Sequence, residues 1–316
     1  MTQLRAGWNA FWFTPRSTLP LAFLRIAFGL LVAVWAFSLR GDVAWFFGPD
    51  GIQPSQPDRP GVLALLRHLN TTWAAYVFVV GVGLAGLALA VGLRSKVAGW
   101  VVFVGLVSLQ YRNPYVVNGG DLLMRLVAVY VALAPTGAAL SYDRWRRHRA
   151  DFWQAPERPL WAVRLLQVQV CVMYFDSVWE KIVGETWRRG TAVGFALAND
   201  ALTRSDAVDW ITGTGWLDNL LTWATLVLEL ALVFLVWNRR LRPWVLLGGV
   251  ALHLGIEIGM PLGFFPLVVM VSYLSFVPVE WAEKVLAPVR ATFDRRGGRR
   301  PARAVAARRH ARPDTP

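Results

Sequence analysis

Eight apolar runs, each long enough or nearly long enough to cross a lipid bilayer, take up most of this 316-residue chain. A spanning helix needs about 20 apolar residues. Lipid offers the backbone no hydrogen-bond partners, so such runs predict helices. The sequence therefore predicts an all-α, polytopic integral membrane helical bundle with about eight transmembrane helices. The predicted spans are 19–39, 72–92, 96–111, 122–140, 160–182, 217–237, 243–259 and 262–277.

The composition points to the same class. Hydrophobic residues make up 55% of the chain and charged residues 17%, whereas soluble domains carry about 25% charged residues. The first run is not followed by a small-residue cleavage site, so we interpret it as a retained span rather than a signal peptide. We expect a multi-pass protein of the cell membrane, surrounded by membrane lipids.

Basic residues predict the orientation, because loops rich in Lys and Arg stay in the cytoplasm. Segments on the N-terminal side of the spans carry 22 Lys and Arg, against 7 on the opposite side. Both termini are therefore predicted to be cytoplasmic, and the loops at 40–71 and 182–216 to face outward.

Three regions follow from this topology. Residues 1–18 are a cytoplasmic segment, 19–280 form the transmembrane domain, and 281–316 are a basic, disordered cytoplasmic tail. The net charge of +13 has three interpretations: nucleic-acid binding, attraction to anionic lipids, or a topology anchor with no partner. We favour the anchor and expect no nucleic-acid partner.

Metal chemistry has no support in the sequence. The chain has one cysteine, Cys171, and its four histidines are far apart. No Cys/His cluster has the spacing of a zinc or iron–sulfur site. We therefore predict no metal site.

Unusual polar clusters all fall on the predicted outer side. They comprise a turn at 47–51, then Arg112, Asn113 and Pro114, then Gly119, Gly120 and Asp121, and finally Lys181 with Trp187 and Gly190. Because all of these clusters lie on the predicted outer side, we take that side as the candidate active face. Each cluster also has a structural interpretation: Asp121 as a helix N-cap, and Trp187 as an interface anchor.

Lys181 has two interpretations. Asp176 and Glu180 are four residues apart and share a helix face, with Lys181 about 100° further round. The three residues form either a buried ion pair that holds spans together, or a site in which burial makes the lysine a base.

Other ionisable residues within the spans are equally ambiguous. His253 and Glu257 are four apart, so the carboxylate either orients the imidazole for chemistry or makes a structural hydrogen bond. Arg125 either binds an anionic substrate group or pairs with Asp121.

Partners and positions of the remaining ionisable groups are also predicted. Arg125 or Arg164 is the predicted partner of Glu229. We expect Arg25 and Arg164 to extend their charged ends toward the membrane surface.

Four stretches together resemble the HTTM ("horizontally transferred transmembrane") family, which is related to vitamin K-dependent gamma-carboxylase. The resemblance covers most of residues 17–280. The stretches are Leu21–Gly29 with the turn at 48–51; Arg112-Asn113-Pro114 with Gly119-Gly120-Asp121, Pro135, Gly137 and 141–143; Arg164–Tyr174 with Lys181, Gly184, Trp187 and Gly190; and His253 to Phe264-Phe265-Pro266.

The resemblance implies a helical membrane domain and a lyase of the carboxylase and epoxidase kind. In the carboxylase, a lysine deprotonates vitamin K hydroquinone, and Lys181 matches that lysine. His253 lies in a span where the carboxylase also places a functional histidine. Some bacterial relatives take part in maturation of secreted peptides, so a quinone-type cofactor and a secreted peptide are the implied partners.

One departure from the carboxylase separates two hypotheses. About forty residues follow the last span, and they do not resemble the carboxylase's large lumenal substrate-binding region. The chain is either a membrane enzyme centred on Lys181, acting on a quinone-linked or peptide substrate, or a non-catalytic membrane protein such as a transporter, an immunity factor or a peptide-maturation partner.

Overall fold

A helix occupies each of the eight predicted spans in the computed structural model, which describes residues 2–53, 63, 65–199, 203–204, 210 and 214–296. These helices are α2 (Leu19–Ser38), α5 (Thr72–Val91), α6 (Ser95–Arg112), α7 (Gly119–Leu133), α9 (Trp161–Val183), α13 (Gly215–Phe234), α14 (Arg242–Gly259) and α15 (Phe265–Tyr273).

The described helices support a membrane-spanning protein. Three stretches are both long and apolar enough to cross a bilayer unaided: Leu19–Gly41, Thr72–Val91 and Gly215–Trp237. The number is four if Phe265–Phe276 and Val279–Phe293 form one interrupted span. The count of eight and the position of the termini remain predictions.

Shorter elements connect these helices. The all-α prediction needs one correction, because β1 and β2 pair as a small antiparallel sheet, with Arg16 opposite Arg158. The shorter elements are α1 (Thr2–Phe13), β1 (Pro15–Ser17), α3 (Val43–Phe47), α4 (Leu65–His68), α8 (Tyr142–Arg147), β2 (Glu157–Pro159), α10 (Glu185–Arg188) and α11 (Ala192–Leu197), with short 3-10 helices at Leu39–Gly41, Pro114–Val116, Arg149–Asp151, Leu235–Trp237 and Leu274–Phe276.

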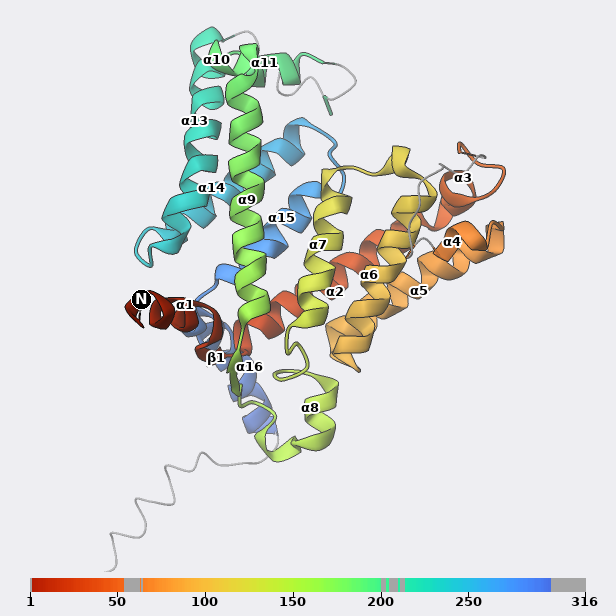
Figure 1. Ribbon diagram of the computed structural model, residues 1–316, viewed down its shortest axis with the longest axis vertical. Coiled ribbons are helices and arrows are strands. Elements are labelled where there is room, and N and C mark those ends of the chain that lie inside the picture. Colours follow the sequence, from red (N-terminus) through yellow and green to blue (C-terminus); the bar gives the residue numbers. More distant parts are fainter. Residues whose placement is uncertain are drawn as a thin grey trace, which may run out of the picture. The chain divides into compact units, whose positions relative to one another are not determined.

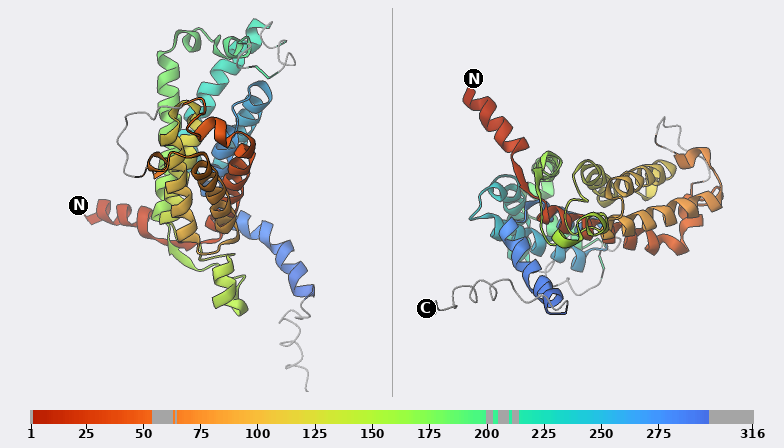
Figure 2. Two further views of the ribbon diagram at one scale, coloured as in Figure 1. Left: turned by 90° about the vertical axis from the view of Figure 1, so that its right-hand side faces the viewer. Right: turned by 90° about the horizontal axis from the view of Figure 1, so that it is seen from below.

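Helices α2 and α5 pack closely because glycines lie where they meet. A Cβ atom on Gly29 would lie 2.5 Å from the Ala90 nitrogen, and one on Gly86 would lie 2.8 Å from the Gly29 oxygen. Small residues are the usual means by which membrane helices approach each other. Helices α6 and α7 continue this layer, each packed on the preceding helix (Figure 2).

Helix α9 packs against α13 and α7, and α15 packs against α7, α14 and α2. Figure 1 shows α9 in green beside α13, with α14 and α15 next to them. Helices from distant parts of the sequence therefore meet around α9.

Arg25 was predicted to extend toward the membrane surface. That prediction is wrong, because Arg25 is fully buried, at 0% exposure. Its guanidinium group donates to the carbonyl oxygens of Thr136 at 2.8 Å, Ala139 at 3.0 Å and Leu140 at 2.6 Å. The segment between α7 and α8 folds over Arg25, and its carbonyl oxygens accept the hydrogen bonds that water would otherwise accept. Arg25 thus joins α2 to the α7–α8 connection.

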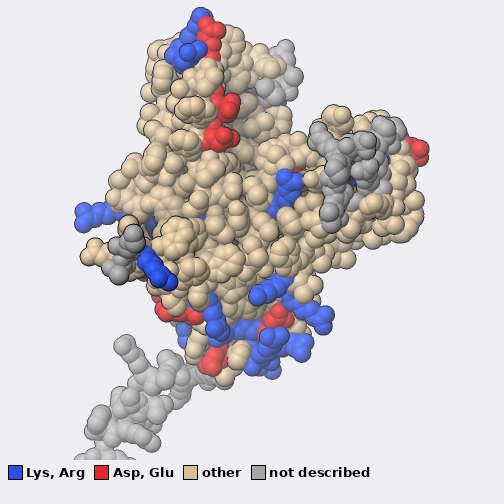
Figure 3. Space-filling model, in the orientation of Figure 1, with Lys and Arg blue, Asp and Glu red and all other residues tan. Residues whose placement is uncertain are grey.

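The two ends of α9 differ in charge. Helices α10 and α11 lie beyond its C-terminal end, and α8 lies on the side of its N-terminal end (Figure 1). Figure 3 shows Lys and Arg side chains gathered at the α8 end, where Arg146, Arg147 and Arg149 are exposed. This distribution agrees with a cytoplasmic α8, although the orientation itself stays a prediction.

The chain divides into two units, residues 1–276 and 277–316. The second unit contains α16 (Val279–Arg296), a helix with Pro288 inside it. Residues 281–296, predicted to be disordered, are therefore helical. The rest of the predicted tail, 297–316, lies outside the described residues.

Candidate functional site

Lys181 lies in the last turn of α9, and its ammonium group forms an ion pair with Glu229 of α13. It also donates to the Ser177 hydroxyl at 2.9 Å, and that hydroxyl donates to the second Glu229 oxygen at 3.3 Å. The Lys181 side chain is 20% exposed and that of Glu229 is 7% exposed. Lys181, Ser177 and Glu229 thus form a closed polar triangle between α9 and α13.

This pairing corrects two predictions. Asp176 and Glu180 are exposed, and Glu229 is the partner of Lys181. The predicted partners of Glu229, Arg125 and Arg164, do not bind it among the described ion pairs. Arg164 instead donates to Gln167 at 2.7 Å and lies over the Phe11 ring.

A second polar group, of Tyr174, His253 and Tyr273, joins α9, α14 and α15. The Tyr174 hydroxyl is 2.7 Å from Nε2 of His253 and forms a hydrogen bond with the Tyr273 hydroxyl. Gly249 makes room for this arrangement, because a Cβ atom there would lie 2.6 Å from the Tyr273 oxygen. Nδ1 of His253 is buried and has no hydrogen-bond partner among the described residues.

The two polar groups belong together. Tyr174, Ser177 and Lys181 are spaced three and four residues apart on α9, which places them on one helix face. Glu229 lies within electrostatic range of both tyrosines, and Lys181 within that of His253. We call Tyr174, Ser177, Lys181, Glu229, His253 and Tyr273 the Lys181 cluster.

Trp187 forms the wall beside the amine. The Lys181 ammonium nitrogen is 5.0 Å from the centre of the Trp187 ring, a distance at which an aromatic face attracts a cation. Gly190 has a φ of +74°, and a Cβ atom there would lie 2.5 Å from Oδ1 of Asn219. The glycine therefore permits the turn between α10, which carries Trp187, and α11.

Glu257 does not orient His253. Its carboxylate pairs with Arg204 instead, and Tyr174 supplies the hydrogen bond to the imidazole. The i, i+4 spacing placed His253 and Glu257 on adjacent turns without specifying which of them faces the bundle interior. His253 is buried, and the Glu257 side chain is 33% exposed.

Arg112 and Asn113 hold the end of α3 and the turn that follows it. Arg112 donates to the carbonyl oxygens of Gly48 at 2.6 Å and Gln53 at 2.8 Å. Asn113 donates to that of Phe46 at 2.8 Å. The turn at 47–51 and the Arg112–Asn113–Pro114 cluster, which are distant in the sequence, thus form one structural unit.

Asp121 belongs to a capping box, although it is not the N-cap residue. The N-cap of α7 is Asn118, whose side chain accepts from the Gly120 and Asp121 nitrogens, and Asp121 accepts from the Asn118 nitrogen at 3.0 Å. Gly120 lies in the first helical turn, where a Cβ atom would be 2.6 Å from Cα of Phe265. Among the described residues, no ion pair joins Arg125 to Asp121.

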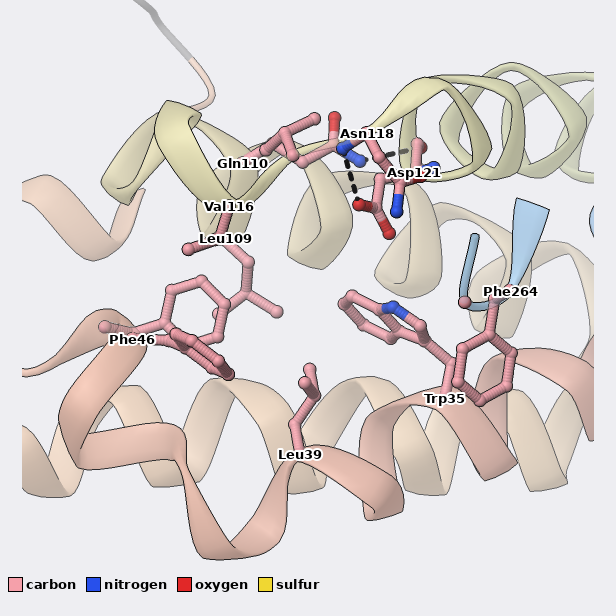
Figure 4. Close-up of a pocket in the computed structure, with 12 residues that line it drawn as sticks. Trp35, Leu39, Phe46, Leu109, Gln110, Val116, Asn118, Asp121 and Phe264 are labelled. Atoms are coloured by element: carbon pink, nitrogen blue, oxygen red, sulfur yellow. Dashed lines mark hydrogen bonds between the residues drawn. The ribbon is translucent and has the colours of Figure 1, made fainter. Parts of the chain in front are cut away.

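A cavity of about 230 Å³ lies beside this capping box. Its walls include Trp35, Phe46, Gln110, Asp121 and Phe264 (Figure 4). Neither Lys181 nor His253 lines it. The next residue, Phe265, packs against the His253 ring with centres 5.7 Å apart, so the cavity and the Lys181 cluster share the start of α15.

Sequence reasoning missed Tyr273 and the role of Tyr174. One available signal was their hydroxyl-bearing rings within otherwise apolar runs, and for Tyr174 the spacing of seven residues from Lys181. Glu229 was noted, but its partner was not.

Comparison with known proteins gives one match. The family model described as "HTTM domain" matches residues 13–281, which is most of the chain. No curated protein and no solved structure matches the chain significantly.

Proposed function

Because the chain belongs to the HTTM domain family, we propose that it is an integral membrane enzyme in which Lys181 removes a proton from a weakly acidic group of its substrate. The observation that carries this proposal is the Lys181 cluster. Placing ionisable residues within a membrane domain costs free energy, so such residues commonly mark functional sites. Here an amine, a carboxylate, an imidazole and two phenols gather within one bundle.

Glu229 gives Lys181 a route to the neutral amine that a base requires. Transfer of one proton from the ammonium nitrogen to the Glu229 carboxylate leaves a neutral amine and a neutral carboxylic acid. The amine lone pair then accepts the substrate proton, and Ser177 keeps both groups in place through its two hydrogen bonds.

The Tyr174–His253–Tyr273 group is the second part of the proposed site. Its hydrogen bonds connect three ionisable side chains, an arrangement suited to holding or passing on a proton. The partnerless Nδ1 of His253 leaves one ring nitrogen for a further donor or acceptor. We propose that His253 supports Lys181 in this way.

A quinone-type cofactor, implied by the resemblance to vitamin K-dependent gamma-carboxylase, would supply the reducing power for oxygen-dependent carboxylation. The residues beside the amine leave no room for the quinone ring, because Glu229, Ser177 and Trp187 surround the ammonium group. Lys181 also does not line the 230 Å³ cavity. A quinone therefore has no part in the proposed proton transfer. A secreted peptide, the other implied substrate, is the proposed proton donor.

Replacing Lys181 tests the proposal. Lys181→Ala and Lys181→Arg are compared with Lys96→Ala, which removes an exposed lysine. If both Lys181 variants reach normal membrane levels but the host behaves as if the gene were deleted, the result supports a catalytic base at position 181. Arginine keeps the positive charge but does not lose its proton. Full function of Lys181→Arg contradicts it.

A non-catalytic membrane protein is the second candidate. The specific observation in its favour is that Glu229 fully partners Lys181, as a structural ion pair between two helices would require. In this case any pair of opposite charges at the two positions would be enough for function.

A further inference from the structure

Four arginines gather at the N-terminal end of α9, and no described acidic residue forms an ion pair with them. They come from β1, β2, the first turn of α9 and the first residue of α14, and are Arg16, Arg158, Arg164 and Arg242. Arg16 lies within electrostatic range of both Arg164 and Arg242. We call these four residues the arginine cluster. Lys181 lies in the last turn of α9, so the cluster is separate from the proposed catalytic site.

The small sheet places two of these arginines side by side. Arg16 and Arg158 are directly opposite each other in the antiparallel pair, so their side chains project from the same face with Cβ atoms about 4.5–5.5 Å apart. The neighbouring pair, Ser17 and Glu157, projects from the other face because side chains alternate along a strand. Like charges directly opposite each other are destabilising, and an anion bound to this face would offset their repulsion.

The arginines of the cluster differ in what their N–H groups can reach. Arg242 donates to three backbone carbonyl oxygens, and Arg164 donates to a side-chain amide oxygen. These two residues therefore contribute mainly positive charge. Arg16 and Arg158 are exposed, so a ligand at the surface can reach their guanidinium groups.

An aromatic surface adjoins the arginine cluster. The Phe11 ring of α1 is 4.8 Å from the guanidinium carbon of Arg164 and 5.8 Å from the Trp237 ring centre, while Trp8 and Phe13 are exposed. Figures 1 and 2 show α1 running across the direction of α9, which it contacts. Since α9 is a predicted span, a helix that runs across its end lies along the membrane surface, where aromatic rings are enriched.

We propose that the arginine cluster binds the phosphate group of an anionic phospholipid. Arg16 and Arg158 donate to the phosphate oxygens, which the planar guanidinium group matches in geometry, and the exposed rings of α1 contact the lipid below its head group. Basic residues beside a membrane span attract anionic lipids. A free phosphate ion would neutralise the arginines but would leave Trp8 and Phe13 in water, so the lipid fits the whole surface better.

Thermal unfolding of the delipidated full chain in a neutral detergent tests the proposal. A ligand that binds the folded state raises the midpoint temperature. The ligands are phosphatidylglycerol, phosphatidylcholine with the same acyl chains, and inorganic phosphate. We expect an apparent affinity for phosphatidylglycerol at least tenfold tighter than for phosphatidylcholine, a weaker effect at high salt because exposed charges are screened, and no stabilisation by inorganic phosphate at the same concentration.

Two double variants of equal net charge tie the effect to this place. Arg16→Gln/Arg158→Gln removes the two exposed arginines of the cluster, and Arg40→Gln/Arg188→Gln removes two exposed arginines elsewhere. The first is expected to weaken phosphatidylglycerol binding at least tenfold, and the second to leave it unchanged. If the first does not fold, Arg158→Gln alone decides, with an expected weakening of at least threefold.

Three results would overturn the proposal: equal stabilisation by phosphatidylcholine, unchanged phosphatidylglycerol binding in the cluster variant that folds, or an equal loss of binding in the Arg40/Arg188 control. Stabilisation by inorganic phosphate as strong as that by phosphatidylglycerol would identify a site for a free anion and would also overturn it.

Discussion

The Lys181 ammonium group pairs with the Glu229 carboxylate across the contact between α9 and α13, 48 residues apart in sequence. Ser177 binds both partners. Because the pair is largely enclosed by protein, each member depends on the other for its compensating charge.

Replacing Glu229 with Ala should lower the free energy of unfolding by about 2 kcal/mol. Removing one partner of a fully buried ion pair costs about 3–5 kcal/mol, and the 20% exposure of Lys181 reduces this loss because water reaches the freed charge. The measurement is thermal unfolding in detergent. Glu180→Ala removes an exposed carboxylate from α9 and should have little effect; equal losses in both variants would refute the role given to Glu229.

Lys181 should react slowly with an amine-acylating reagent, and Glu229→Gln should make it react faster. The pair stabilises the ammonium form, which is not nucleophilic. The chain contains two other lysines, Lys96 and Lys284, both exposed, and these serve as internal standards in mass spectrometry. If Lys181 in the unaltered chain reacts as fast as Lys96, the ion pair does not persist in solution.

Gly249→Ala should destabilise the protein by about 1–3 kcal/mol, the usual range for an overpacked site. The new methyl group would lie 2.6 Å from the Tyr273 oxygen and would disturb the Tyr174–Tyr273 hydrogen bond. Gly255 is a matched control on the same helix, since a Cβ atom there would have nothing within 4 Å. Gly255→Ala should be neutral or stabilising by up to about 1 kcal/mol, as judged by unfolding midpoints; similar shifts in the two variants would show that Gly249 has no special role.

Arg25→Met should destabilise the protein by at least about 2 kcal/mol. Methionine fills part of the space but leaves the carbonyl oxygens of Thr136, Ala139 and Leu140 without their buried donor, and each unpaired group costs about 1–3 kcal/mol. Arg40→Met, at an exposed position, is the control. Unchanged stability of Arg25→Met in a chemical denaturation series would show that water replaces the guanidinium group there.

The sequence predicted the helices well because the apolar runs and the backbone's need for internal hydrogen bonds specify them locally. It did not predict where Arg25 lies. A position one or two turns into a span is compatible with reaching the surface, and only the fold of the α7–α8 connection supplies the carbonyl oxygens that bury it.

The site was predicted in part for a similar reason. Lys181 could be singled out as a cation at the end of an apolar run. Its partner could not, because i, i+4 spacing compares residues within one helix, and that comparison suggested Asp176 and Glu180. Glu229 and Tyr273 reach the cluster through the packing of α13 and α15, which spacing along one helix does not encode.

The most direct test of a catalytic Lys181 is the charge-exchanged variant Lys181→Glu/Glu229→Lys, compared with each single substitution. An ion pair requires only opposite charges, whereas a base requires the amine at position 181. We predict that both single variants lose thermal stability and that the double variant regains it. A host that carries the double variant should nevertheless behave as if the gene were deleted. Recovery of normal function together with stability in the double variant would contradict the account.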